Sequence, residues 1–311
     1  MFFNSFLNAL PGAVAQGLIW GLMSIGVYIT YKILDIADLS VDGTLCTGGA
    51  VCAMMMISGH NVWVSMLVAT IAGMLAGMMT GVFHVFMGIP PILAGILTQL
   101  SLYSINLKIM GVANKGLPSR NYDVLVSMQN VKKMPITENT LFIVLLFNIA
   151  LIVVLYWFFG TELGCGIRAT GSNRKMARAQ GINTNMNRVI GLVLSNGIVG
   201  LSGALLTQYQ GFADVSMGRG AIVVGLAAVI IGESLFGKLL KHNFALKLTQ
   251  IALGGIVYYI VYQTVILMGI DPDLLKMLSA LVVAVFLAIP YIKEEYFPKS
   301  YLNKGVKKCS K

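Results

Sequence analysis

Charged side chains are scarce in this sequence: Asp, Glu, Lys and Arg make up only 11% of its 311 residues. None of the four occurs between Gly43 and Leu107, between Leu141 and Gly160, or between Leu248 and Ile270. Apolar residues account for 57% of the chain, well above their share in soluble domains. Because about 20 apolar residues suffice to cross the hydrocarbon core, these runs exclude a soluble globular protein and predict several membrane spans.

Cysteine is also scarce, and its four positions argue against disulfides and zinc sites. Cys46 and Cys52 lie in apolar segments, whereas Cys165 and Cys309 lie in basic ones, without the spacing of disulfide pairs or metal ligands. The sequence has no phosphate-binding glycine loop ending in Lys-Ser or Lys-Thr, no zinc-protease motif and no nucleophile elbow. We therefore expect no catalytic residue, no metal site and no cofactor bound by this chain.

The apolar runs divide at glycines and prolines, which are turn and helix-stop signals. Spans are expected near residues 11–31, 44–58, 62–87, 92–110, 141–160, 189–209, 220–235, 248–268 and 274–291. No Lys or Arg precedes Lys32, so the first run is expected to be a retained span rather than a cleaved signal peptide. The predicted fold class is an all-α polytopic membrane bundle in one domain over residues 1–311, with about 8–10 transmembrane helices including short or broken ones.

Glycines spaced three or four residues apart predict close contacts between these helices, because small residues let helix backbones approach. The sequence has 34 glycines in all. The patterns are Gly17/Gly21, Gly73/Gly77/Gly81 and Gly197/Gly200/Gly203.

The distribution of basic residues predicts the orientation. The net charge is +10, and 16 of the 22 Lys and Arg residues follow residue 160. The basic segment 164–188 lies between two expected spans and is expected in the cytoplasm, because cationic loops stay on that side. Alternation then places the N-terminus and the hydrophilic stretch 111–139 outside, and the basic tail 292–311 inside. The positive charge therefore indicates topology and contact with anionic lipid rather than nucleic acid.

The segment 164–188 also has the signals of a short helix. Ser172 is expected to cap a helix over residues 173–180, and Gly181 is expected to end it in the left-handed conformation. On this helix Met176 is an apolar side chain surrounded by cations, which suits a groove in a soluble partner. The alternative is a basic helix lying on anionic lipid.

Polar residues within the apolar runs are candidates for a solute pathway, because they are costly in lipid unless they face water or other helices. The short segment that begins near Asp42 has hydroxyls and glycines at its start, where the helix dipole favours an anionic group. For Asp35, Asp38 and Asp42 we favour capping and hinge roles. Helix contact is the alternative role for the other polar residues. The pathway candidates are Asp42, Thr44, Thr47, Gln99, Asn196 and Gln208.

Two stretches resemble a known family. Residues 166–183, GIRATGSNRKMARAQGIN, look like the coupling-helix motif of the permease subunits of bacterial ABC importers of the branched-chain amino acid type. Residues 33–43, ILDIADLSVDG, are similar to a subgroup associated with uptake of aromatic amino acids, including tryptophan. The resemblance covers nearly the whole chain. Gly232-Glu233 departs from it, because much of the family carries paired glycines there, which indicates a divergent subgroup.

The resemblance implies a type II ABC importer fold and a permease that moves a small solute, an aromatic or branched-chain amino acid, by alternating access. The chain itself would have no ATPase site, and the partner subunit would bind ATP. Implied partners are cytoplasmic ABC ATPase subunits, an extracytoplasmic solute-binding protein and a second copy in a homodimer. The implied location is the bacterial plasma (inner) membrane, with the C-terminus in the cytoplasm. The implied ATPase-coupling residues are Arg168, Gly171, Asn173, Met176, Ala177, Ala179 and Gly181.

Two other functions are weighed against this one. In a stand-alone channel or secondary carrier, the basic segment would only set the topology. A membrane-embedded enzyme acting on lipid is disfavoured, because the sequence shows no cluster of acid, base or metal-ligating residues.

Overall fold

The computed structural model describes residues 2–117, 122–132, 139–237 and 243–268, with isolated positions at 277, 280–281, 284–285 and 288. The chain begins with α1 (Phe2–Tyr28), the π-helical turn η1 (Ile29–Ile33), α2 (Val41–Ile57), α3 (Val62–Gly81), a second π-helical turn η2 (Val82–Phe86) and α4 (Pro91–Met110). It continues with β1 (Asn114–Gly116), the 3-10 helix η3 (Met128–Lys132), α5 (Thr140–Gly160), α6 (Glu162–Ser172) and α7 (Arg174–Ala179). Then come α8 (Thr184–Gln210), β2 (Phe212–Asp214), α9 (Ala221–Phe236) and α10 (Phe244–Leu267).

Six of the described helices are long and apolar enough to cross a membrane: α1, α3, α4, α5, α8 and α10. Two further apolar helices are shorter, α2 with 17 residues and α9 with 16. These eight helices confirm the predicted polytopic helical bundle and its two short segments. The ninth expected span, 274–291, lies almost wholly outside the described residues, and the expected basic tail 292–311 lies entirely outside them.

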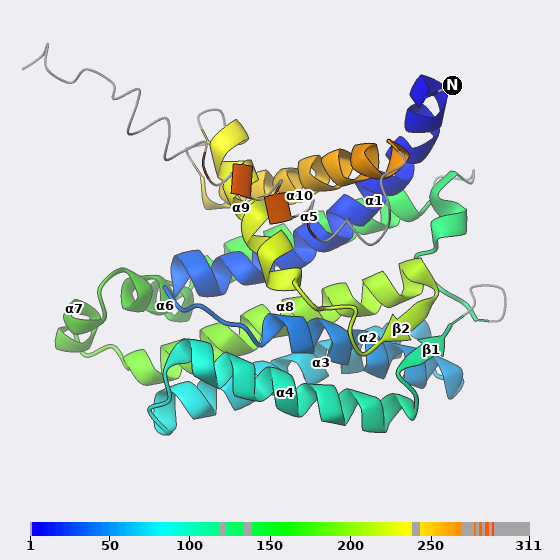
Figure 1. Cartoon of the computed structure of the whole chain (residues 1–311). Coiled ribbons are helices and arrows are strands. Elements are labelled where there is room, and N and C mark those ends of the chain that lie inside the picture. Colours follow the sequence, from blue (N-terminus) through cyan, green and yellow to red (C-terminus); the bar gives the residue numbers. More distant parts are fainter. Residues whose placement is uncertain are drawn as a thin grey trace, which may run out of the picture.

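One pair of three-residue strands was not predicted. β1 and β2 pair antiparallel, with Lys115 opposite Ala213, and they link the stretch after α4 to the stretch after α8. Figure 1 shows this pair at the opposite end of the bundle from α7. We call these two ends the strand end and the α7 end.

Helix α8 runs through the middle of the bundle. Figure 1 shows α1, α5 and α10 on one side of it and α2, α3 and α4 on the other, and α8 contacts α1, α2 and α3 directly. Most of its length is buried. Because it touches both groups of helices, α8 joins them into one packed body.

Glycines at the helix crossings allow the backbones of neighbouring helices to come into direct contact. A methyl group at Gly73 would collide with the Asn196 carbonyl, and one at Gly48 would collide with the Gly200 carbonyl. On the other side of α8, Gly17 of α1 faces the backbone of Ile256 in α10. The close packing predicted from the glycine spacing is therefore confirmed at the crossings of α2, α3 and α8 and at that of α1 and α10.

The two short helices both begin inside the bundle. From η1, at the α7 end, the chain runs back through residues 34–40 before α2 begins near the middle (Figure 1). After β2, residues 215–220 likewise lead inward from the strand end to the start of α9. The far part of α9 returns toward the α7 end, where Glu233 pairs with Lys32 at 3.3 Å. The two helices thus start close together and diverge toward opposite ends.

We expect Gly48→Val to lower the stability of the bundle, because its side chain would enter the α8 backbone. Overpacking of this kind costs about 1–3 kcal/mol of unfolding free energy. Thermal unfolding of the purified protein in detergent measures the effect. Gly160→Val is the matched control, because a side chain there meets no atom within 4 Å. Equal unfolding midpoints for the two variants would contradict the backbone contact.

Candidate functional site

The α7 end presents a short helix with well-defined boundaries. The Asn173 side chain caps α7 by accepting a hydrogen bond from the Met176 amide at 3.0 Å. Gly181 follows the helix with φ of +81°, the left-handed conformation that the sequence predicts. The predicted cap, Ser172, is wrong by one residue. Ser172 is the last residue of α6, and that helix continues until the Asn173 amide donates to the Ala169 carbonyl at 3.0 Å.

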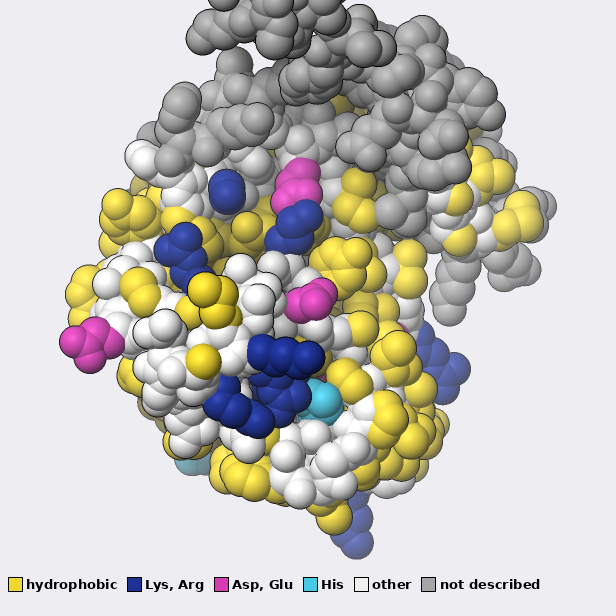
Figure 2. Space-filling model, turned by 90° about the vertical axis from the view of Figure 1, so that its left-hand side faces the viewer, with side chains coloured by type: hydrophobic (Ala, Val, Ile, Leu, Met, Phe, Trp, Pro, Cys, Tyr) yellow, Lys and Arg dark blue, Asp and Glu magenta, His cyan; other side chains and the backbone are white. Residues whose placement is uncertain are grey.

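Basic side chains gather beside α7. Arg174 and Arg178 both donate to the Asn185 side-chain oxygen, at 3.3 and 3.4 Å, and Arg188 lies 3.3 Å from His84 Nε2. Figure 2, which views this end of the bundle, shows basic side chains clustered around a histidine. Among the described residues, none of these three arginines pairs with a carboxylate. This basic surface, Arg174, Arg178, Arg188 and His84, therefore suits an acidic partner.

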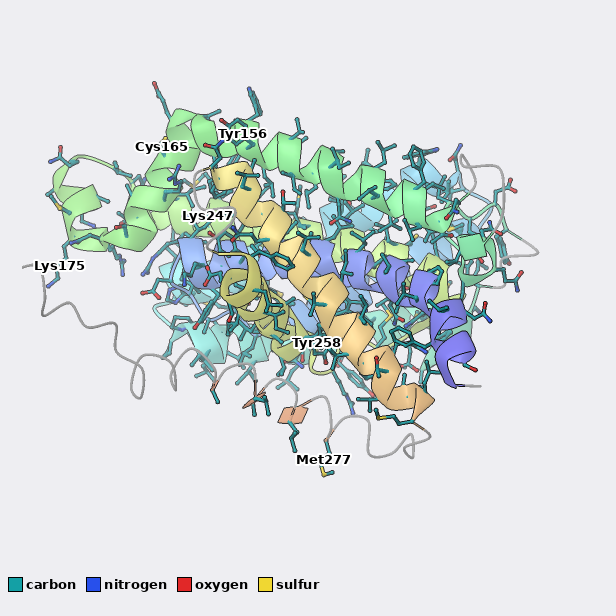
Figure 3. All side chains as sticks on the ribbon, turned by 90° about the horizontal axis from the view of Figure 1, so that it is seen from above. Tyr156, Cys165, Lys175, Lys247, Tyr258 and Met277 are labelled. Atoms are coloured by element: carbon teal, nitrogen blue, oxygen red, sulfur yellow. The ribbon has the colours of Figure 1, made fainter. Side chains whose placement is uncertain are left out.

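Met176 supplies an apolar contact next to the basic surface. Its side chain is 65% exposed, whereas the next residue, Ala177, is buried against the protein. Figure 3 shows Lys175 at the outer tip of α7, beyond the end of α10 that carries Lys247. The helix therefore projects from the bundle with one apolar side chain and several cations free to meet another protein.

Two of the expected coupling residues lie in α6 and contact the bundle instead. The Arg168 guanidinium carbon lies 5.6 Å from the centre of the Phe244 ring, at the start of α10. Gly171 packs against the backbone of Ile33 and Leu34, where η1 ends, and any side chain at this position would collide with the Ile33 carbonyl. Helix α6 thus connects α7 to the end of α1 and to the start of α10.

A buried polar cluster follows η1. Asp38 is 1% exposed and accepts hydrogen bonds from the Ser40 amide at 2.9 Å and from Asn196 Nδ2 at 2.7 Å. The Asn196 side-chain oxygen in turn accepts from the Thr44 hydroxyl at 2.7 Å. These bonds join the start of α2 to α8. They agree with the capping role that the sequence suggests for Asp38.

Asp42 connects the starts of the two short helices. Its carboxylate accepts hydrogen bonds from the Gly220 amide at 2.9 Å and the Ile222 amide at 3.0 Å, which are free N–H groups at the start of α9. Gly218 lies so close that a side chain there would collide with the Asp42 carbonyl. The Gly218 amide also points at Cys46 Sγ, at 3.2 Å. Asp42 therefore caps a helix far from it in sequence.

A cleft of about 380 Å³ opens beside Asp42. The start of α2, one face of α4 and the segment before α9 form its walls. Asn106 is fully buried in this wall; its amide nitrogen donates to the Gly43 carbonyl at 3.5 Å, and its side-chain oxygen has no partner in the described part of the chain. The lining residues are Asp42, Gly43, Cys46, Gln99, Leu100, Tyr103, Asn106, Val215 and Arg219.

The structure brings only two of the six pathway candidates into the cleft, Asp42 and Gln99. Thr44 and Asn196 belong to the buried polar cluster. Thr47 donates to the Gly43 carbonyl at 3.0 Å within α2. Gln208 lies nearer the strand end, where its side-chain oxygen accepts from the Leu125 amide at 3.1 Å. Solute contact by these four residues stays a prediction.

Sequence reasoning missed Arg219 as a site residue. The arginine directly precedes a short apolar segment, a position typical of a charge at the membrane surface. Because α9 begins midway along the bundle, the residue before it lines the cleft at that depth, with its side chain exposed. The shortness of the segment was the available signal. Asn106 stands in the sequence as a polar residue within an apolar run, and only the structure shows that its oxygen lacks a partner.

Comparisons with known proteins identify the family of this chain. The pattern of the family described as the permease component of the branched-chain amino acid transport system matches residues 10–289. A tyrosine transport system permease protein of Clostridioides difficile (strain R20291) is 36% identical over 282 residues, 91% of each chain. The uncharacterized protein RP368 of Rickettsia prowazekii (strain Madrid E) is 34% identical over 93% of this chain and 99% of its own.

A more distant relative is named for a different solute. The autoinducer 2 import system permease protein LsrC of Salmonella choleraesuis (strain SC-B67) is 27% identical over 70% of this chain and 60% of its own. The chain therefore belongs to the permease family of the branched-chain amino acid transport systems and is a multi-pass permease subunit of an ABC importer for a small solute.

Proposed function

We propose that this permease carries an amino acid, aromatic or branched-chain, across the bacterial plasma membrane by alternating access. Its family works with ATPase and solute-binding partners. The relative named for tyrosine transport, 36% identical along most of both chains, supports an amino acid solute. The observation that carries the mechanism is the packing of α6 on η1. Through this contact α6 connects the exposed helix α7 with η1, and residues 34–40 lead from η1 to the cleft.

We place the α7 end in the cytoplasm, facing the ATPase subunits, which bind the ATP. The basic surface and the exposed Met176 support this orientation, since basic segments stay on the cytoplasmic side. The strand end then faces the solute-binding protein outside the cell. The alternation of spans, including the one expected over 274–291, brings the C-terminus into the cytoplasm.

The coupling runs through three packed contacts. Movement of α7 is transmitted through α6 to η1 at Gly171 and to α10 at Arg168. From η1, residues 34–40 lead to the buried polar cluster and to Asp42. The starts of α2 and α9 are joined at Asp42. A shift of η1 and residues 34–40 therefore moves the walls of the cleft. ATP binding by the partner subunits would supply that movement.

We also propose that two copies of the chain form the pathway. The cleft carries the exposed, charged Arg219 and the partly exposed Asp42 about midway along the bundle. Charged groups at this depth face water or protein rather than lipid. A second copy placed against this face would close the cleft from lipid and form a pathway between the two copies.

Amino acid transport is tested by uptake into proteoliposomes that hold this chain with its ATPase and binding protein. We expect ATP-dependent uptake of radiolabelled L-tyrosine or L-leucine and no effect of excess fructose. The measured quantity is the initial rate with ATP, compared with the rate with ADP. Uptake of fructose, or equal rates with ATP and ADP, would contradict the proposed function.

We expect Met176→Asp to weaken binding of the ATPase, because it places a negative charge in the apolar contact. A central interface side chain contributes about 2 kcal/mol, so capture by the immobilised ATPase should fall at least about tenfold. Met128→Asp is the matched control, since Met128 is 68% exposed and lies outside α7. Equal capture of the two variants would rule out docking through Met176.

Gly171→Val separates docking from transmission. The new side chain would push α6 away from the end of η1 while leaving the exposed face of α7 intact. We therefore expect the variant to bind the ATPase, and the bound ATPase to hydrolyse ATP, while most of the solute uptake is lost. Gly160→Val, in open space at the end of α5, should keep both activities. Normal uptake by Gly171→Val would show that this contact does not carry the coupling.

A further inference from the structure

The cleft holds two opposite charges that do not pair with each other. Asp42 and Arg219 both line it, yet the only ion pair among the described residues joins Lys32 to Glu233. The Asp42 carboxylate is held by the two amides of α9, and the Arg219 guanidinium has no hydrogen-bonding partner in the described ranges. Opposite charges in one low-dielectric space attract strongly, so their separation leaves room for a ligand that meets both.

A third polar group in the wall lacks a partner. The Asn106 side-chain oxygen is fully buried, and an unpaired buried acceptor costs free energy. This oxygen can only accept a hydrogen bond, so its missing partner is a donor. Asn106 and Asp42 are both close to Gly43: Asn106 bonds to its carbonyl, and Asp42 precedes it in the chain. The acceptors therefore gather on one side of the cleft.

The position of these groups excludes lipid as the missing partner. The cleft lies where α2 and α9 begin, and helices of 17 and 16 residues each extend about 25 Å from that point toward opposite ends of the bundle. Figure 1 shows the start of α2 near the middle of the bundle. At that depth polar groups line a cavity or contact protein.

We propose that this cleft binds the zwitterionic head of a free α-amino acid. The ammonium donates to the Asp42 carboxylate and the Asn106 side-chain oxygen, and the carboxylate accepts from the Arg219 guanidinium, whose planar fork matches it. The inference rests on the proposed function and adds the solute-recognising residues of the permease itself. It assigns recognition of the two charges of the solute to three side chains: Asp42 of α2, Asn106 of α4 and Arg219 of the segment before α9.

The other residues of the cleft suit an apolar side chain on that amino acid. Leu100 and Val215 offer aliphatic surface, and Tyr103 offers a partly exposed ring. Aromatic rings pack well against such surfaces. The volume of about 380 Å³ is at the small end of ligand pockets, which hold whole small molecules. A neutral sugar would leave Asp42 and Arg219 desolvated without a counter-charge, which is unfavourable.

The test measures binding to the full chain purified in detergent with its ATPase partner and without the binding protein. Radiolabelled L-tyrosine is the probe. Tyramine, which lacks the carboxylate, and 3-(4-hydroxyphenyl)propionate, which lacks the ammonium, are the competitors. For the wild type we expect each analogue to compete at least about tenfold less well than unlabelled L-tyrosine, because each loses a charge-assisted contact.

Variants assign each charge to one end of the solute. The Arg219→Gln variant should lose its preference for tyrosine over tyramine. It should still prefer tyrosine to 3-(4-hydroxyphenyl)propionate. Asp42→Asn should do the reverse, and its amide oxygen can still accept a hydrogen bond from the start of α9. Lys108→Gln is the matched control, since Lys108 is an exposed cation on α4 outside the cleft. A single gel-filtration peak for every variant shows that it is folded.

Two results would overturn the inference while leaving the proposed function intact. One is ATP-driven amino acid uptake by proteoliposomes whose permease binds no L-tyrosine or L-leucine at millimolar concentration. The other is an unchanged preference over tyramine in Arg219→Gln. If the proteoliposomes take up no amino acid at all, the proposed function itself fails, so the two failures are distinguishable.

Discussion

The arrangement of the cleft depends on one interaction, the pair of hydrogen bonds that Asp42 accepts from the start of α9. A helix that begins inside a membrane bundle exposes free backbone amides where no water is at hand, and each must find an acceptor. Asp42 provides acceptors for two of them, and the neighbouring Asp38 accepts from the start of α2 and from α8. Because of these bonds, α2 and α9 can each be a short helix in place of a full-length span. The space between their starts can then hold polar side chains.

The same end-to-end arrangement brings irregular helical backbone to the α7 end. Both π-helical turns occur at the α7 end: η1 contacts Gly171, and η2 carries His84, which meets Arg188 of the basic surface. π-helical turns are rare and are frequently found at functional sites. The segments that contact α6 and the basic surface are therefore irregular turns rather than regular α-helix.

The sequence predicts most of the fold because the physical constraints of a bilayer are simple. The absence of charge marks the spans, the short runs mark α2 and α9, and the glycine spacing marks the crossings with α8. The strand pair escaped prediction, since three residues are too few to show an alternating pattern. The sequence correctly predicts a short helix that ends at Gly181. Its cap was ambiguous, because both Ser172 and Asn173 are residues that cap helices. Only the observed end of α6 at Ser172 shows that Asn173 is the cap. Sites formed by distant segments, such as the cleft lined by Arg219 and Asp42, cannot be assembled from the sequence, although the shortness of the segment after Arg219 hints at its depth.

The interior position of the two connections 34–40 and 215–220 also limits how this protein can vary over evolutionary time. Surface loops tolerate insertions and deletions because their length changes little else. Here Asp38 and Gly218 are buried in the connections themselves, and each connection sets where a helix begins. One added residue would rotate the following helix by about 100° and remove its capping contacts. Relatives with different solutes are therefore expected to differ by substitution in these two segments and to conserve their lengths.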